Sequence, residues 1–211
     1  MHSIVIQDEE IYLLPEKALW WPAQKVLIVA DLHWGKSAHF RKNGIAIPAN
    51  TQRQDEKRLA DLIQQHKAEH LIIAGDLFHS KANNETDAFQ SWRKAHLSLQ
   101  ISLVIGNHDI LPEDTYTSLN VHLHKDAYHY APFLISHYET DTPHFTIHGH
   151  IHPAIRMNGN GRQSIRLSCF AQTKNSLILP AFGQFTGTHT IEEKTCKHIY
   201  VIADNKILQW K

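Results

Sequence analysis

The stretch Val26-Leu-Ile-Val-Ala-Asp-Leu-His33 decides the fold, because a short run of aliphatic and β-branched residues ends in an acid and a histidine. Such a run is typical of a strand that is buried on both faces of a parallel sheet. Residues 71–74 and 101–105 have the same character, and each run is also followed by polar residues. The three runs therefore predict three buried strands with polar clusters at their carboxyl ends.

Helical spacing occupies the stretches between these runs. One set of mostly apolar side chains falls at i, i+3, i+4 and i+7 and consists of Leu59, Leu62, Ile63 and His66. A second set, at i, i+4, i+7 and i+11, consists of Ala88, Trp92, Ala95 and Leu99. Each pattern predicts a helix with one buried face. Strands and helices that alternate in this way predict parallel strands joined by right-handed crossovers.

The second half of the chain has a different pattern, since the helical spacing stops at about residue 120. Short strands are expected at residues 132–138, 144–149, 164–170, 176–179 and 198–210. The last of these segments is expected to form a hairpin that turns at Asp204-Asn205. An α/β half followed by β-strands predicts a mixed sheet, or two facing sheets, with helices outside.

The composition is that of an ordinary globular chain, with 211 residues, of which 42% are hydrophobic and 20% charged. There is no repeat or linker, so we expect one domain over residues 1–211. Lys and Arg together number 21, as do Asp and Glu, so no long-range field attracts nucleic acid or membrane. Any polyanionic substrate must be held locally. The 18 histidines are the anomaly, and they point to metal or proton chemistry.

The two cysteines, Cys169 and Cys196, lack the spacing of a structural zinc site or a disulfide framework. We interpret them as small hydrophobic residues in a reducing cytosol. The first residues lack the basic start and apolar run of a signal peptide, and no stretch approaches the roughly 18 apolar residues of a membrane span. The sequence therefore predicts a cytoplasmic protein that has no membrane partner.

The polar clusters are expected to meet, because ligands bind beyond the carboxyl ends of the strands in open α/β sheets. Two histidine groups in the second half add to them. The candidate metal ligands are Asp31, His33, Asp76, Asn107, His137, His150 and His152. Oxygen and imidazole donors without thiolate suit Mn²⁺, Fe²⁺ or Zn²⁺. Seven donors are enough for two ions that share a carboxylate, and Asp76 is the expected bridge.

Five motifs follow one another in an order that resembles the calcineurin-like metallophosphoesterases. They are Asp31-Leu-His33, Gly75-Asp76, Gly106-Asn-His-Asp109, His137 and Gly149-His-Ile-His152. A closer resemblance is to the bacterial ligase-associated DNA-damage-response metallophosphoesterases. That resemblance rests on Ala30-Asp-Leu-His-Trp-Gly-Lys36, Phe40-Arg41 with Gly44 and Pro48, Gly75-Asp-Leu-Phe-His79 and Leu179-Pro-Ala-Phe-Gly183.

The resemblance implies a four-layer α/β/β/α sandwich of two mixed sheets flanked by helices. It also implies two divalent ions, Mn²⁺ first with Fe²⁺ or Zn²⁺ as alternatives. One ion would take Asp31, His33, Asp76 and His152, and the other Asp76, Asn107, His137 and His150. The implied reaction is hydrolysis of phosphodiester bonds by a nuclease that acts on DNA or RNA and is linked to DNA repair. A DNA ligase and a helicase are the implied partners.

One position departs from the wider family pattern, which often reads Gly-Asp-x-x-Asp, because His79 stands at its last place. His79 either orients a metal ligand or is an ordinary packed or solvated histidine. Lys36 and Arg41 follow the first cluster and either bind flanking phosphates or belong to a solvated face.

The leaving alkoxide of a cleaved phosphodiester needs a proton, and His108 has no assigned metal role. We hypothesise that His108 is the general acid and that Asp109 holds its ring, for a contribution of about 10²–10⁴-fold. Two other functions remain open. The neutral charge favours a phosphodiesterase or phosphatase for small nucleotides. The other is a protein of another class, an inactive metal-bound scaffold that recruits a repair partner. A structural metal site of that kind would be closed, and the presence of Asn107, His108 and Asp109 argues against it.

Overall fold

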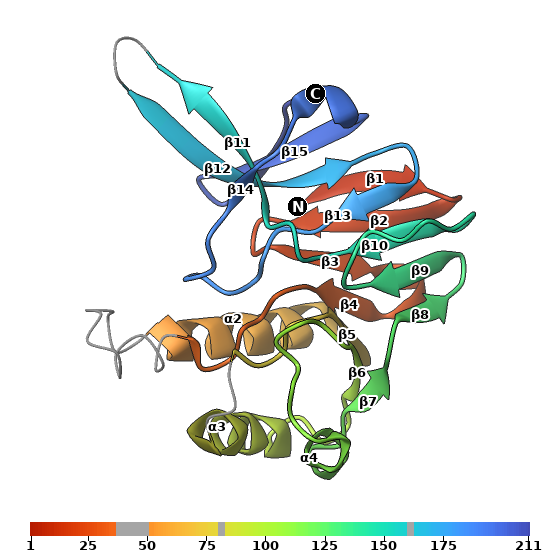
Figure 1. Ribbon diagram of the computed structural model, residues 1–211, viewed down its shortest axis with the longest axis vertical. Helices are drawn as coiled ribbons and strands as arrows, with labels where there is room; N and C mark the ends of the chain where they lie inside the picture. Colours follow the sequence, from red (N-terminus) through yellow and green to blue (C-terminus); the bar gives the residue numbers. More distant parts are fainter. Residues whose placement is uncertain (37–50, 80–82, 160–162) are drawn as a thin grey trace.

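The computed structural model describes residues 1–36, 51–79, 83–159 and 163–211. Two β-sheets face each other in it, and the α-helices lie against the outer side of the first sheet (Figure 1). The expected α/β class with two mixed sheets and flanking helices is confirmed.

The first sheet has seven strands in sequential order, β1 to β7. Their bounds are β1 His2–Ile6, β2 Glu9–Leu14, β3 Ala18–Trp21, β4 Val26–Val29, β5 His70–Ala74, β6 Gln100–Val104 and β7 His122–His124. Strands β4 to β7 run parallel, which confirms the three buried strands and their crossovers. The antiparallel strands β1 to β3, of four to six residues each, were not expected.

Three α-helices lie within the described residues, α2 Thr51–His66, α3 Asn83–Lys94 and α4 Glu113–Ser118. The first two confirm that helices lie where the spacing predicted them, although α3 ends at Lys94, so Ala95 and Leu99 of the expected pattern lie beyond it. Helix α4 is too short to show a periodic pattern in the sequence. Two short 3₁₀ turns, η1 Pro22–Gln24 and η2 Glu193–Thr195, complete the helical elements of this part of the chain. No described helix is long and apolar enough to cross a membrane.

The second sheet has nine strands, with β14-β11-β12-β13-β10-β9-β8 in order and β15 and β16 attached to β12. Their bounds are β8 Ala127–Tyr130, β9 Phe133–Ser136, β10 Phe145–His148, β11 Pro153–Asn158, β12 Ser164–Gln172, β13 Ser176–Ile178, β14 His189–Thr190, β15 His198–Ala203 and β16 Lys206–Gln209. The expected hairpin is confirmed, because β15 and β16 turn at Asp204 and Asn205, which have φ values of 47° and 56°.

The core has two principal layers, one on each face of the first sheet. In β4, Leu27 and Val29 face the helices, whereas Val26 and Ile28 face the second sheet. This alternation explains why the run is apolar throughout. A smaller cluster lies on the outer face of the second sheet, where the segment around η2 brings Cys196 onto β12 and β15. Cys169 and Cys196 are both free and buried.

Candidate metal centre

The candidate ligands lie where strands of the two sheets end, in loops that are joined by backbone hydrogen bonds. The Asp31 N–H donates to the Gly75 carbonyl at 3.1 Å, and the His33 N–H donates to the Asp76 carbonyl at 2.9 Å. The loops after β4 and β5 are therefore a single unit. The chain order of the motifs has become a spatial cluster, as the parallel topology requires.

The backbone of this cluster is not extended, contrary to the expectation that alternation would place ligands two residues apart on one side. Five of the seven candidate ligands have a positive φ: Asp31, His33, Asp76, His150 and His152, at 54°, 46°, 56°, 67° and 52°. This left-handed conformation is costly for residues other than glycine and concentrates at functional sites. The paired side chains converge because of these turns and not because of a strand.

One group of side chains gathers around Asp31. Its ligand atoms and those of His33 and His152 lie within 4.8 Å of one another. The Asp31 Oδ1 atom is 3.2 Å from His152 Nε2, and its Oδ2 atom accepts the His150 N–H at 3.0 Å. A buried carboxylate oxygen and two imidazoles thus converge on one point.

A second group gathers around His137, at the end of β9. Its Nε2 atom lies 3.1 Å from Asn107 Oδ1, 3.2 Å from His150 Nδ1 and 3.7 Å from Asp76 Oδ2. The same Asp76 oxygen is 3.8 Å from His33 Nε2. Asp76 therefore lies between the two groups, where a shared ligand would have to be.

The donor set fits divalent cations. Asp31 Oδ1, His33 Nδ1 and His152 Nε2 are buried, and apart from the 3.2 Å contact between Asp31 and His152 none of them has a hydrogen-bond partner within the described part of the chain. Burial lowers the pKa of His33 and of His150, so their imidazoles stay neutral, which is the form that binds a metal. Burial also raises the pKa of Asp76, a cost that a bound cation would offset. Unpaired donors beside buried carboxyls are what a missing cation would leave.

Glycine is required where the loops approach the ligands. Gly75 has a φ of 87°, and a Cβ atom there would overlap the ring of His137. A Cβ on Gly106 would overlap the carboxylate of Asp76. The motifs Gly-Asp and Gly-Asn-His-Asp therefore contain glycine so that the backbone can approach the ligands closely.

We expect Gly75→Ala to lower the free energy of unfolding by about 1–3 kcal/mol, since it combines a strained φ with a steric overlap. It should also displace His137 and weaken metal binding. Gly187→Ala is the matched control, because a Cβ at Gly187 meets nothing within 4 Å. Denaturant unfolding and metal titration of both variants check this, and equal stability of the two would contradict the close approach.

Asp109 was expected to hold the ring of His108, but its carboxylate contacts backbone N–H groups instead. Its Oδ2 atom accepts the N–H groups of Asp76 and Gly106 at 2.8 and 2.9 Å, and its Oδ1 atom accepts those of Leu77 and Phe78 at 2.9 and 3.4 Å. Both carboxylate oxygens accept hydrogen bonds from backbone N–H groups, so Asp109 holds the loops after β5 and β6 together. Burial nevertheless raises its pKa to about 7.

We expect Asp109→Ala to lower the free energy of unfolding by about 2–4 kcal/mol, because it leaves several buried N–H groups without an acceptor. Asp109→Asn keeps one carbonyl oxygen and should lose less. Thermal unfolding of both variants with the metal chelated measures the difference. Equal losses for Ala and Asn would show that the charge, and not the acceptor, matters.

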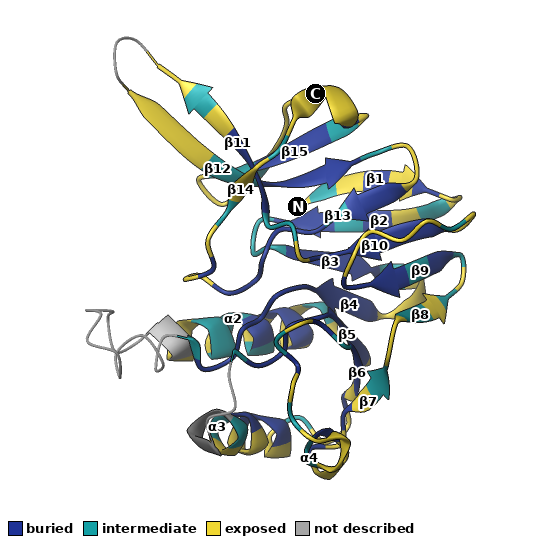
Figure 2. Ribbon diagram, in the orientation of Figure 1, coloured by how far each residue is buried: buried dark blue, intermediate teal, exposed yellow. Residues whose placement is uncertain are grey.

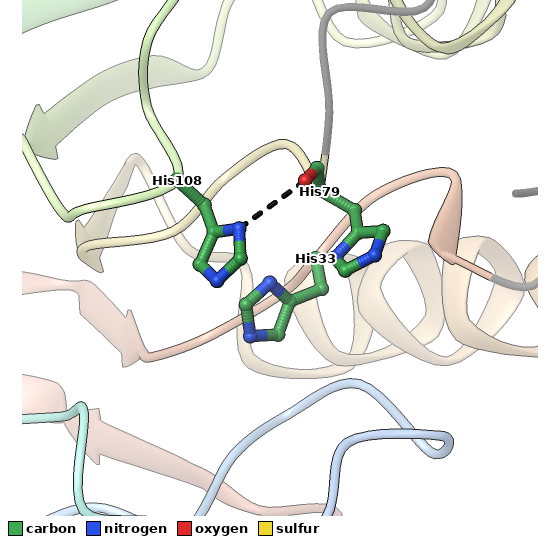
Figure 3. A group of neighbouring side chains, drawn as sticks. All are labelled: His33, His79 and His108. Atoms are coloured by element: carbon green, nitrogen blue, oxygen red, sulfur yellow. Dashed lines mark hydrogen bonds between the residues drawn. The ribbon is translucent and has the colours of Figure 1, made fainter.

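Three histidines, His33, His79 and His108, form the group drawn in Figure 3, with ligand nitrogens within 4.8 Å of one another. The His108 Nδ1 atom lies 3.2 Å from the carbonyl oxygen of His79, and the two rings stack at 5.3 Å between centroids. The His33 ring lies edge-on to both, with centroids 4.9 Å from His108 and 5.6 Å from His79. The backbone of His79, and not Asp109, therefore orients the His108 ring.

The remaining sequence candidates divide into three cases. Lys36 is half-buried beside His33, and burial lowers its pKa while the charges of Asp76 and Asp31 oppose that shift. Trp34 and Phe78, which belong to two of the motifs, are buried core residues. Arg41, with Phe40 and Lys42, lies outside the residues that the structure describes.

Tyr138 is a residue at this site that the sequence reasoning missed. Its hydroxyl donates to Asn107 Oδ1 at 3.3 Å, and its ring centroid lies 4.6 Å from those of His137 and His150. The side chain is 46% exposed, so it forms an open edge of the centre. Its position directly after His137 was the available signal.

A family profile and several solved structures are similar to this chain. The profile of the calcineurin-like phosphoesterases matches residues 24–180. The structure is similar to a nuclease MPE of Pseudomonas putida, with 29% sequence identity and a TM-score of 0.82 over 99% of this chain and 98% of that one. A phosphoesterase from E. coli, Yfce, aligns at 12% identity and a TM-score of 0.47 over 87% and 97% of the two chains.

No curated protein matches the chain. The family profile covers well over half of the sequence and includes every candidate ligand. The chain therefore belongs to the calcineurin-like phosphoesterase family.

Proposed function

We propose that the protein is a phosphodiesterase with two divalent ions that cleaves nucleic acid. The observation that carries the proposal is the position of Asp76, whose Oδ2 atom lies 3.8 Å from His33 and 3.7 Å from His137, one in each group of donors. Asp31, His33, Asp76 and His152 would hold one ion. Asp76, Asn107, His137 and His150 would hold the other.

Mn²⁺ is the first candidate metal, with Fe²⁺ and Zn²⁺ as alternatives, because the donors are carboxylate, amide and imidazole without thiolate. Divalent ions at such a centre lower the pKa of coordinated water towards about 7 and neutralise phosphate oxygens. The protein's part is to hold neutral imidazoles and a shared carboxylate in fixed positions. The Asp109 carboxylate supports this arrangement, because it accepts hydrogen bonds from the backbone N–H groups of Asp76 and Gly106.

His108 is the proposed proton donor. Its Nδ1 atom faces the His79 carbonyl, which fixes that nitrogen as a donor and leaves Nε2 free to carry the transferred proton (Figure 3). Its backbone N–H donates to Asp76 Oδ1 at 2.9 Å, so the backbone that carries the ring is held beside the proposed bridge. Protonating the leaving oxygen is the step that these contacts support.

A nucleic-acid substrate is supported by the similarity to a nuclease from Pseudomonas putida. The motifs shared with the ligase-associated subfamily support a role in DNA repair, with a DNA ligase and a helicase as partners in the cytoplasm. A phosphodiesterase for small nucleotides is the second candidate. It is favoured by the equal numbers of acidic and basic residues.

Hydrolysis of four substrates with Mn²⁺ tests the proposal: a single-stranded oligodeoxynucleotide, a cyclic nucleotide, an aryl phosphodiester and the matching monoester. We expect cleavage of the oligonucleotide and the aryl diester that a chelator abolishes. Turnover of only the small esters would favour the second candidate. If the metal-loaded protein hydrolysed none of these substrates, the result would favour the inactive metal-bound scaffold, which is a function of another class.

A further inference from the structure

The β11–β12 hairpin extends away from the body of the molecule (Figure 1). It begins at Pro153, directly after the candidate ligand His152, and most of its outer part is exposed (Figure 2). The segment from Pro153 to Gln172 contains three arginines and no acidic residue. In a chain with no net charge, this is a local concentration of positive charge in the sequence directly after a candidate ligand.

The register divides the hairpin into two faces. Arg156 pairs with Arg166 and Asn158 with Ser164, so these four residues share one face. The opposite face carries Met157, Leu167 and their neighbours, which pack against the outer cluster of the second sheet. We call the four-residue face the basic face. Its partner face is used for packing, so the basic face is available to a ligand.

The two arginines of the basic face oppose each other without a counter-charge. Neither guanidinium has an ion pair within the described residues. Arg156 donates to Ser164 Oγ at 3.2 Å, and Arg166 donates to the Thr188 carbonyl at 3.2 Å. Like charges directly opposite each other across strands destabilise a sheet, and a bound anion would remove that cost.

A groove lies beside the metal centre. It has a volume of about 400 Å³ and is lined by His150, Ile151, His152, Gly187, Thr188 and His189. Arg166 reaches the rim of this groove through its hydrogen bond to Thr188. Two candidate ligands, His150 and His152, therefore line the groove, and the guanidinium of Arg166 lies at its rim.

We propose that the basic face binds backbone phosphates of a nucleic-acid strand whose scissile phosphate lies at the metal centre. This inference rests on the proposed function and specifies its substrate as an extended strand. Arg156 lies four residues beyond His152, which is about 13 Å along an extended chain. A stacked nucleic-acid strand places about four phosphates over the same distance. A dinucleotide would not reach the basic face, whereas a longer strand would.

The double variant Arg156→Gln/Arg166→Gln tests the inference against Lys67→Gln/Lys174→Gln. The control removes the same charge from exposed positions before β5 and β13, at the opposite end of the sheets from the ligands. Binding of a labelled single-stranded 20-mer is measured by anisotropy with the metal chelated. We expect about 10-fold weaker binding for the arginine variant at low salt, and a loss of about 1.4 in the salt slope for two contacts.

Turnover provides the second readout. With Mn²⁺, the arginine variant should hydrolyse an aryl phosphodiester and a dinucleotide at the parent rate but cleave the 20-mer less efficiently. Unchanged binding of the 20-mer, or an equal loss in the lysine control, would overturn the inference while leaving the phosphodiesterase in place. Failure of the parent protein to hydrolyse any diester would instead count against the proposed function.

Discussion

Asp76→Asn is expected to lower hydrolysis of phosphodiesters by about 10³-fold or more. The carboxylate lies between the two donor groups, with its Oδ2 atom 3.8 Å from His33 Nε2 and 3.7 Å from His137 Nε2. Its loss removes several kcal/mol of charge stabilisation, and each 1.36 kcal/mol corresponds to about a factor of ten in rate. Metal titration should find that tight binding of two ions is lost.

The fold should survive this substitution. Asn retains an oxygen that can accept the His108 N–H, which Asp76 Oδ1 accepts at 2.9 Å. Burial raises the pKa of Asp76, so ionising it without metal costs stability, and a neutral amide avoids that cost. We therefore expect the chelated variant to unfold at the same temperature as the chelated parent, or higher. Asp61→Asn, an exposed carboxylate on α2, is the control and should retain both metals and activity.

His108→Asn should slow turnover by about 10²–10⁴-fold without changing the metal content, if His108 is the proton donor. The size of the loss should depend on the leaving group. An aryl oxide leaves without a proton, whereas a sugar alkoxide needs one, so cleavage of the oligonucleotide should fall more than cleavage of an aryl diester.

His129→Asn is the matched control, since His129 is exposed on β8 and contacts only the ring of His144 among the described aromatic residues. Equal losses for the aryl and alkyl leaving groups would indicate that the His108 ring does not protonate the leaving oxygen. Loss of bound metal in His108→Asn would contradict the proposed role outright.

Much of the fold was predictable because a strand that is buried on both faces is apolar at every position. The run from Val26 to Val29 is apolar at every position because helices cover one face and the second sheet covers the other. The antiparallel strand β1 was missed for the opposite reason. In β1, Val5 is 69% exposed and the pattern is short, so periodicity alone does not separate it from a loop.

The candidate ligands were predictable as a set because their motifs follow strand ends, and parallel strands bring those ends to one edge. The roles of their neighbours were not. Asp109 was expected to face His108, but its oxygens accept N–H groups from the loop after β5, which is 31 to 33 residues away in sequence. No local pattern records a contact between a side chain and distant backbone.

The sequence by itself determined the order of buried strands and the chemistry of the donors that follow them, because apolar periodicity and ligand type are properties of residues close together in the chain. Only the tertiary structure decided which donors share a point in space, which carboxylate braces the loops and where the basic face stands relative to the groove. Those features depend on left-handed turns at Asp31, Asp76 and His150 and on packing between the two sheets, which arise only when segments far apart in the chain come together.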